Sequence, residues 1–204
     1  ELGTVWRRLG SEVEVIEFLP RVLNGMDSEV SEKFHKILLQ QGLKFKLEHS
    51  VEKTSLIKDK VHVEIKDLKT SKIDTIEADI VLVAVGRRPN TDNLGLDKIG
   101  VKVDERGFVE TDDKFKTSVD NIYAIGDVIK GPMLAHKAEE EGIAVAEILA
   151  GQAGHVNYDV IPGVIYTSPE VATVGKTEEQ LKEENKSYKT GKFPFLANSR
   201  AKVN

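Results

Sequence analysis

The stretch Asn121-Ile122-Tyr123-Ala124-Ile125-Gly126-Asp127 decides how the rest of the sequence is interpreted. Four apolar residues in a row, with β-branched Ile122 and Ile125, predict a buried strand. Gly126 allows a sharp turn, and Asp127 then follows the carboxyl end of the strand, where open α/β sheets bind ligands. A carboxylate at this place can accept hydrogen bonds from a ribityl or ribose chain. The alternative is that Asp127 only caps a turn or the next helix.

The segment that follows favours the ligand-binding interpretation of Asp127. Gly131-Pro132-Met133-Leu134-Ala135-His136-Lys137-Ala138 predicts a helix from Met133 to about Ala150. Its first N–H groups and its positive dipole end would face the same ligand as Asp127. Within this helix, Glu139, Glu140 and Glu141 form a charge run, for which a solvated helix face is expected.

Composition and charge exclude several classes of function. The 204 residues carry a net charge of −5 with acids and bases mixed, so no basic stripe indicates a nucleic-acid partner. Five scattered His and no Cys leave no metal-ligand spacing, and the absence of Cys excludes thiol chemistry within this chain. No apolar run approaches the ~20 residues of a membrane span. The first residues show no signal or transit features, and we expect a fragment that begins within a helix and ends within a domain.

The N-terminal third has the pattern of the second half of a dinucleotide-binding βαβ unit. A helix to Leu9 is predicted by the spacing of Leu2, Val5, Trp6 and Leu9. A strand over 12–18 follows, with Glu17 near its end. There, a carboxylate would bind both ribose hydroxyls of NAD and repel the 2′-phosphate of NADP. The alternative is a solvated Glu at a strand end.

The middle of the chain predicts further α/β elements. A helix begins at Asp27 or Ser28 and runs to about Gln41, and a strand over 43–47 follows it. An antiparallel hairpin excursion is predicted over 50–78, with His62 on its polar, surface-exposed face. The apolar run 79–85 predicts a central parallel strand, after which Gly86 allows close backbone approach to a ligand.

The role of the two arginines that follow Gly86 stays open on the sequence alone. Arg87 and Arg88 could bind phosphate, but solvated or salt-bridged interdomain arginines are equally consistent with the pattern, so neither is assigned to a site. Pro162-Gly163 marks a boundary, and Thr177 to Gln180 has the form of a capping box that opens a helix to about Asn185. Short strands are predicted over 108–110, 164–166, 171–174 and 188–195.

Several long motifs resemble one family. "VAVGRRPNT", "TSVDNIYAIGDV" and "GPMLAHKAEEEG" resemble the signatures of the pyridine nucleotide–disulfide oxidoreductases. "VIYTSPEVATVGKTEEQLKEE" and "GKFPFLANSRAK" are most similar to the dihydrolipoamide dehydrogenases within that family, of the mitochondrial type. The resemblance extends over the whole chain.

The resemblance implies an α/β fold of two dinucleotide-binding domains, one for FAD and one for NAD(P), present in part. It also implies the beginning of an α+β interface domain that forms dimers. The expected domains are residues 1–89, an NAD-binding domain without its first strand and Gly-rich turn, and residues 90–157, the C-terminal segment of the central and FAD domain. Residues 158–204 would begin the dimerisation domain.

The resemblance also implies the residues of two cofactor sites. For NAD these are Glu1, Glu17, Val51 and Gly86. For FAD they are Asp127, Met133, Leu134, Ala135 and His136. No catalytic residue and no metal ligand is expected in this chain, because the redox CxxxxC pair and the C-terminal His–Glu pair of the family lie in segments that the sequence does not contain. His136 is therefore not assigned as a general base.

The activity implied by the resemblance is oxidation of protein-bound dihydrolipoamide through a disulfide and FAD, with reduction of NAD. A homodimer is implied, with lipoyl domains and the E2/E3-binding subunits of 2-oxoacid dehydrogenase complexes, or the glycine cleavage system, as partners in the mitochondrial matrix. Neither nucleic acid nor a membrane span is expected, and the chain alone should be inactive. Three alternatives stay open: another flavin disulfide reductase, such as glutathione or mercuric reductase; a non-catalytic binding or dimerisation fragment; or a stretch of an intact enzyme.

Overall fold

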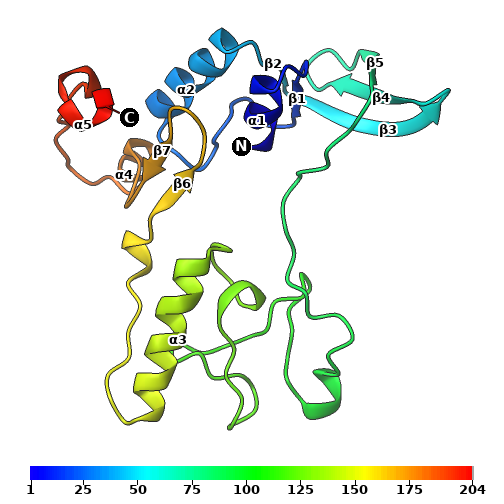
Figure 1. Cartoon of the computed structure of the whole chain (residues 1–204). Coiled ribbons are helices and arrows are strands. Elements are labelled where there is room, and N and C mark those ends of the chain that lie inside the picture. Colours follow the sequence, from blue (N-terminus) through cyan, green and yellow to red (C-terminus); the bar gives the residue numbers. More distant parts are fainter. Residues whose placement is uncertain (204) are drawn as a thin grey trace. The chain divides into compact units, whose positions relative to one another are not determined.

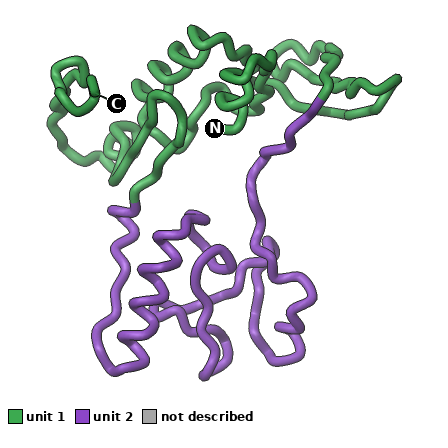
Figure 2. Tube along the Cα trace, in the orientation of Figure 1, with its two compact units in different colours: residues 1–79, 162–204 green, residues 80–161 purple. Residues whose placement is uncertain are grey.

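The computed structural model describes residues Glu1 to Val203, which form two compact units. Figure 2 colours the first unit, residues 1–79 and 162–204, green, and the second, residues 80–161, purple. The chain therefore passes between units near Asp79 and Ile161. These crossings lie within about ten residues of the expected domain boundaries at 89 and 157, which stay predictions. Over residues 1–203, no helix has the length and apolar character needed to cross a membrane.

The first unit opens with the helix–strand–helix–strand order that the sequence predicted (Figure 1). The elements are α1 (Leu2–Arg8), β1 (Glu14–Glu17), α2 (Ser28–Gln40) and β2 (Lys44–Leu47), and β1 pairs with β2 in parallel. Phe34 and Leu38 lie one turn apart on α2 and pack with Leu43 in a small core. Burial of this apolar face holds α2 against the two parallel strands.

The predicted antiparallel excursion is a three-stranded meander. It consists of β3 (His49–Ile57), β4 (Lys60–Asp67) and β5 (Ile73–Ala78), with β4 in the middle. Val63 and Ile65 are buried, whereas the alternate residue His62 pairs across the sheet with Ser55 and Glu77 on the more polar face. The alternation in β4 therefore assigns the two faces as expected.

The C-terminal part of the first unit confirms most of its predicted elements. They are β6 (Gly163–Ile165), β7 (Val171–Thr173) and α4 (Glu178–Glu183), and α4 opens with the predicted capping box. The predicted strand over 188–195 is wrong: this segment is irregular and leads into η4 (Phe195–Ala197) and α5 (Ser199–Val203). Phe193 is 69% exposed, and Lys192 bonds to Glu29 on α2 instead. Without a neighbouring strand, the backbone polar groups have no ladder to join.

The second unit is organised around α3 (Ala135–Leu149), with three short 3-10 turns, η1 (Asp97–Ile99), η2 (Gly126–Val128) and η3 (Tyr158–Val160). Its core consists of Val101, Val109, Phe115, Ile129, Ala144 and Val156. The start and end of α3 agree with the predicted helix to within two residues.

The strands predicted at 122–125 and 108–110 are wrong. In the second unit the described chain has only isolated bridges, Val103 with Val109 and Lys116 with Tyr123. The Asp112 carboxylate accepts the N–H groups of Lys114 and Lys116, each at 2.9 Å. Asp104 does the same for Arg106 and Phe108, also at 2.9 Å. Side-chain bonds of this kind occupy backbone donors that a strand ladder would need.

The strand predicted over 79–85 is also wrong. This segment is irregular, and Val83 and Val85 are 74% and 94% exposed. Its apolar sequence suits a strand covered on both faces, but no strand of residues 1–203 pairs with it. A strand needs such a partner for its N–H and C=O groups.

Candidate functional site

The turn at Gly126 and Asp127 lies directly against helix α3. Gly126 has φ +74°, and a Cβ there would lie 3.2 Å from the Ala138 Cβ. Glycine is therefore required both by the left-handed backbone and by the close approach to the helix. The Asp127 side chain is 52% exposed at the surface of this turn. Its carboxylate is thus accessible at the surface, and its role in binding a ligand stays a prediction.

Arg87 links two of the residues that the sequence assigned to FAD. Its guanidinium lies 3.7 Å from the Asp127 carboxylate and donates a hydrogen bond to the main-chain oxygen of Met133. Asp127 and Met133 therefore lie within reach of one side chain. The sequence left Arg87 unassigned, because "GRRPN" does not indicate which arginine turns toward this site.

The N-terminus of α3 carries the other predicted FAD residues. Met133 and Leu134 precede the helix, Ala135 begins it and His136 follows in its first turn. Leu134 is extended, with φ −130° and ψ 134°, and no side chain of the described residues caps the helix. The first-turn N–H groups of a helix lack intrahelical acceptors and lie at its positive dipole end. Together with the Asp127 carboxylate, they suit a ligand with phosphate and hydroxyl groups, as FAD has.

A buried ion pair lies behind this turn. Lys137 and Glu141 are fully buried, with Lys137 Nζ 3.0 Å from Glu141 Oε1. Lys137 Nζ donates to the Gly126 oxygen at 3.0 Å, and the Gly126 N–H donates to Glu141 Oε2 at 2.7 Å. The Tyr158 hydroxyl donates to Glu141 Oε1 at 2.6 Å. Every charged group of the pair thus has hydrogen-bond partners, which a buried charge requires.

The prediction of a solvated charge run is therefore wrong for Glu141, although Glu139 and Glu140 are exposed. Glu141 lies on the apolar face of α3, three residues before the buried Ala144. The signal was present in the sequence, because Lys137 and Glu141 are spaced i,i+4 and continue the face of Ala144 and Ile148.

The residues assigned to NAD are distributed over both units. In the first unit, the Glu17 carboxylate at the end of β1 accepts the Leu19 N–H at 2.9 Å. Glu1 precedes α1 and accepts the Tyr166 N–H at 2.8 Å, and Val51 lies in β3 with 51% of its surface exposed. Gly86 belongs to the second unit and has φ +116°, with open space where a Cβ would stand. The structure thus places three of the four in the first unit and the fourth in the second.

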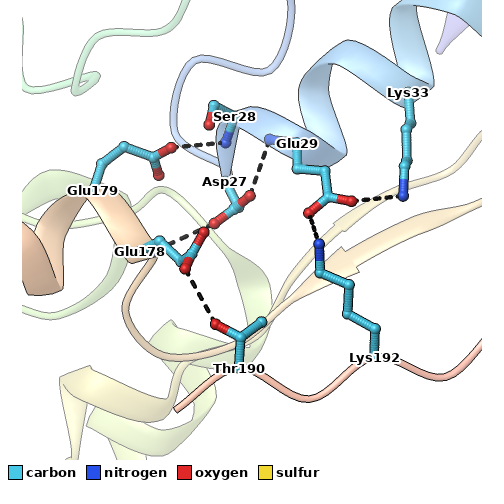
Figure 3. Close-up of polar contacts among 8 residues, drawn as sticks. All are labelled: Asp27, Ser28, Glu29, Lys33, Glu178, Glu179, Thr190 and Lys192. Carbon is cyan, nitrogen blue, oxygen red and sulfur yellow. Dashed lines mark hydrogen bonds and ion pairs between the residues drawn. The ribbon is translucent and has the colours of Figure 1, made fainter. Parts of the chain in front are cut away.

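Helices α2 and α4 cap each other inside the first unit (Figure 3). Asp27 accepts the Glu29 N–H of its own helix at 3.0 Å and the Glu178 N–H of α4 at 3.3 Å. In return, Glu179 of α4 accepts the Ser28 N–H of α2 at 3.2 Å. Each helix thus supplies a carboxylate to the other's positive end, which joins α4 to α2 and so residues 162–203 to residues 1–79.

This reciprocal cap predicts a pH dependence. Hydrogen bonds from Ser28, with the backbone N–H of Glu179 itself, lower the pKa of Glu179 to about 2 from 4.5. Because the pKa of Glu179 is lowered on folding, its ionised carboxylate stabilises the folded state at pH values above the unfolded pKa of 4.5. This stability is lost as the pH falls from about 4.5 to about 2. Glu179→Gln should remove part of the acid sensitivity of unfolding over this range. Urea titrations at a series of pH values would measure it, with Glu183→Gln, on the same helix, as the control; equal slopes for both variants would contradict the prediction.

Comparison with known proteins places this geometry in one class, a nucleotide-binding α/β oxidoreductase. The family described as pyridine nucleotide-disulphide oxidoreductase matches residues 1–142, and its dimerisation domain matches residues 161–204. The chain belongs to the pyridine nucleotide-disulphide oxidoreductase family. This confirms the family and the α/β fold class that the sequence predicted. The family depends on FAD and NAD, as expected.

The individual relatives belong to narrower classes of enzyme than the family as a whole. The chain is 55% identical over 201 residues to a dihydrolipoyl dehydrogenase of Cupriavidus necator, covering 98% of this chain and 42% of that protein. It is 53% identical to the mitochondrial dihydrolipoyl dehydrogenase of Pisum sativum, covering 100% and 40%. Among solved structures, the HOCl-induced flavoprotein disulfide reductase RclA from Escherichia coli matches with a TM-score of 0.87 at 28% identity, over 99% of this chain and 46% of that one. The chain therefore spans less than half the length of these relatives.

Proposed function

We propose that this chain forms the NAD-side and flavin-side walls, and the start of the dimerisation region, of a dihydrolipoyl dehydrogenase. The observation that carries the proposal is identity of 53–55% along nearly the whole chain to proteins of that name. The full-length enzyme would oxidise protein-bound dihydrolipoamide and reduce NAD. With no Cys among its 204 residues, this chain supplies no redox disulfide and is inactive alone.

The residues of the second unit support a role in binding FAD. Asp127 would accept a hydroxyl bond from the ribityl or ribose chain. The residues Met133 to His136 would offer backbone groups and the positive end of α3 to the cofactor's phosphates. FAD, when bound, supplies the transfer of reducing equivalents between the dithiol and NAD. Asp127 and the residues Met133 to His136 would hold and orient FAD.

Four residues are proposed for the NAD site: Glu1, Glu17, Val51 and Gly86. Glu17 would bind the ribose hydroxyls of the adenosine, and Gly86 would leave space for the nucleotide. The bond from the Leu19 N–H holds the Glu17 carboxylate at the strand end, where the second oxygen remains available to a hydroxyl.

The test of this function is an intact mass and a visible spectrum, followed by an activity assay. Purified full-length protein should show a flavin absorption band at about 450 nm, as expected from flavin chemistry. It should also reduce NAD in the presence of dihydrolipoamide. RclA supports a second candidate, a different flavin disulfide reductase, because its TM-score of 0.87 shows that the same fold serves that class. Flavin without dihydrolipoamide activity would favour this second candidate, and protein without flavin would contradict both.

The cofactor preference gives a further prediction for Glu17. Glu17→Arg in the full-length enzyme should lower kcat/KM for NAD and raise it for NADP, because an acidic group that repels a 2′-phosphate becomes one that pairs with it. A change in the preference ratio of about tenfold or more is expected from the loss of one charged hydrogen bond. The matched control is Glu12→Arg, the same charge change before β1. An unaltered ratio for Glu17→Arg would contradict the role of Glu17.

The proposed partners and cellular location of the full-length protein are those of a dihydrolipoyl dehydrogenase. The match to a dimerisation domain over 161–204 supports a homodimer. Lipoyl domains and the E2/E3-binding subunits of 2-oxoacid dehydrogenase complexes are the proposed partners. The Pisum sativum relative is mitochondrial, which supports the matrix, but the Cupriavidus necator relative is equally similar. Fractionation of the source cells would decide between a matrix and a bacterial location.

A further inference from the structure

We propose that Lys137 and Glu141 are positioning residues for the flavin site. Their buried ion pair holds the backbone of Gly126, and thereby sets the direction in which Asp127 presents its carboxylate. The inference rests on the proposed FAD site and adds two residues that do not themselves contact the ligand.

The ion pair engages both polar backbone groups of one residue, Gly126. The Gly126 N–H donates to Glu141 at 2.7 Å, and the Gly126 oxygen accepts from Lys137 at 3.0 Å. The two peptide planes that flank Gly126 are therefore both tied to α3. Since the Asp127 N–H belongs to the second of these planes, its Cα is fixed relative to the helix as well.

The ion pair also lies on the helix whose N-terminus carries the other proposed FAD residues. Lys137 lies in the first turn of α3, immediately after Met133 to His136. Asp127 and these residues must contact one cofactor together, although they are separated by a loop. Hydrogen bonds from α3 to Gly126 close this loop and fix the two parts of the site with respect to each other.

Two glycines of the loop before α3 lie close to the helix residues around the ion pair. Gly131 has φ +125°, and a Cβ there would lie 3.1 Å from Lys137 Cε. Gly126, with φ +74°, would place a Cβ 3.2 Å from Ala138. Glycine at both positions thus leaves room for the lysine stem and lets the turn reach the helix. The loop is shaped around the ion pair, as expected where a buried pair sets one conformation.

The energetics indicate that stability alone does not account for the pair. Replacing a buried ion pair by apolar residues of similar volume is often neutral or stabilising, whereas removing one partner is costly. The Tyr158 hydroxyl also bonds to Glu141, but Tyr158 is 46% exposed, whereas Gly126 is buried. Gly126 would lose the partners of both its backbone groups, and solvent cannot replace them without opening the turn.

The experiment compares FAD affinity in full-length variants. Apoprotein would be titrated with FAD, and the quenching of flavin fluorescence would give Kd. Lys137→Met/Glu141→Leu removes both charges and both bonds to Gly126, and should weaken FAD binding about tenfold. Lys137→Met/Glu141→Gln keeps an acceptor for the Gly126 N–H and should recover part of this loss. The control is Lys116→Met/Asp120→Leu, which removes another i,i+4 pair of the second unit, 2.9 Å apart with Asp120 fully exposed.

A double-mutant cycle separates positioning from a general structural effect. If the pair acts through Asp127, combining Lys137→Met/Glu141→Leu with Asp127→Ala should weaken binding little more than Asp127→Ala does. Hydrogen exchange of the apoprotein supplies a second readout. Amides at Gly126 to Val128 should exchange faster in the double variant than in the wild type, while the middle of α3 stays protected.

Each outcome is decisive. Wild-type Kd and unchanged exchange in Lys137→Met/Glu141→Leu would overturn the inference and leave the proposed function intact. Fully additive losses with Asp127→Ala would also overturn it, because the pair would then act elsewhere. If neither double variant folds, the pair is a folding requirement and the positioning role is refuted. A wild-type protein that binds no FAD would instead refute the proposed function, and the flavin role of the pair with it.

Discussion

Asp127→Ala in the full-length protein should weaken FAD binding by about ten- to a hundredfold, since a hydrogen bond to a charged group contributes roughly 1.5–3 kcal/mol. The carboxylate is half exposed at the surface of a turn whose backbone is held from behind by α3. It is therefore both accessible and fixed in direction, so little of its bonding energy is used in ordering it. Dialysis of the purified variant should release FAD that the wild type retains.

The same substitution should leave stability nearly unchanged. The partner of Asp127 in the structure is Arg87, whose guanidinium lies 3.7 Å from the carboxylate. The Arg87 side chain is 63% exposed and the Asp127 side chain 52%. An ion pair of this exposure contributes little to folding. A loss of FAD with an unaltered unfolding midpoint of the apoprotein would thus identify a ligand contact. The control is Asp120→Ala, an exposed carboxylate in the same unit. Stoichiometric FAD after dialysis of Asp127→Ala would contradict the site.

The sequence predicted the first unit well because its signals are local. The apolar spacing in 2–9, the Asp27 cap of α2, the alternation around Val63 and the capping box at Thr177 each depend on a few neighbouring residues. Local propensity and turn chemistry agree there with the final packing. The elements consequently appear where the pattern places them.

The strands that were wrong depend on partners that a local pattern does not contain. Residues 79–85 and 122–125 have the composition of buried strands, but in residues 1–203 they have no continuous ladder. The site shows the same difference. Asp127 was predicted from its place after a glycine, whereas Arg87 and Glu141 contact this turn from 40 and 15 residues away in sequence. Contacts of that range follow from the packing of the unit.

Gly154→Ala should destabilise the second unit by about 3 kcal/mol, the upper part of the range for overpacked sites. A Cβ at Gly154 would lie 2.1 Å from the backbone oxygen of Ala144 and 2.8 Å from its carbonyl carbon. The backbone of a helix cannot move away from such a contact as a flexible side chain can. Ala144 is 1% exposed and packs in the core with Val156, so the clash would have to separate the segment after α3 from the helix.

Gly151→Ala is the control that separates this clash from the cost of an unusual backbone. Gly151 has φ +76° but open space around its Cβ position, so alanine there should cost only about 1–2 kcal/mol. Urea titration of both apoprotein variants, followed by circular dichroism, would compare them. Equal unfolding free energies would contradict the contact at Ala144. Because Met133 to His136 lie at the N-terminal end of α3, a shift of the helix at Ala144 should also weaken FAD binding. Gly151→Ala should leave the Kd for FAD unchanged.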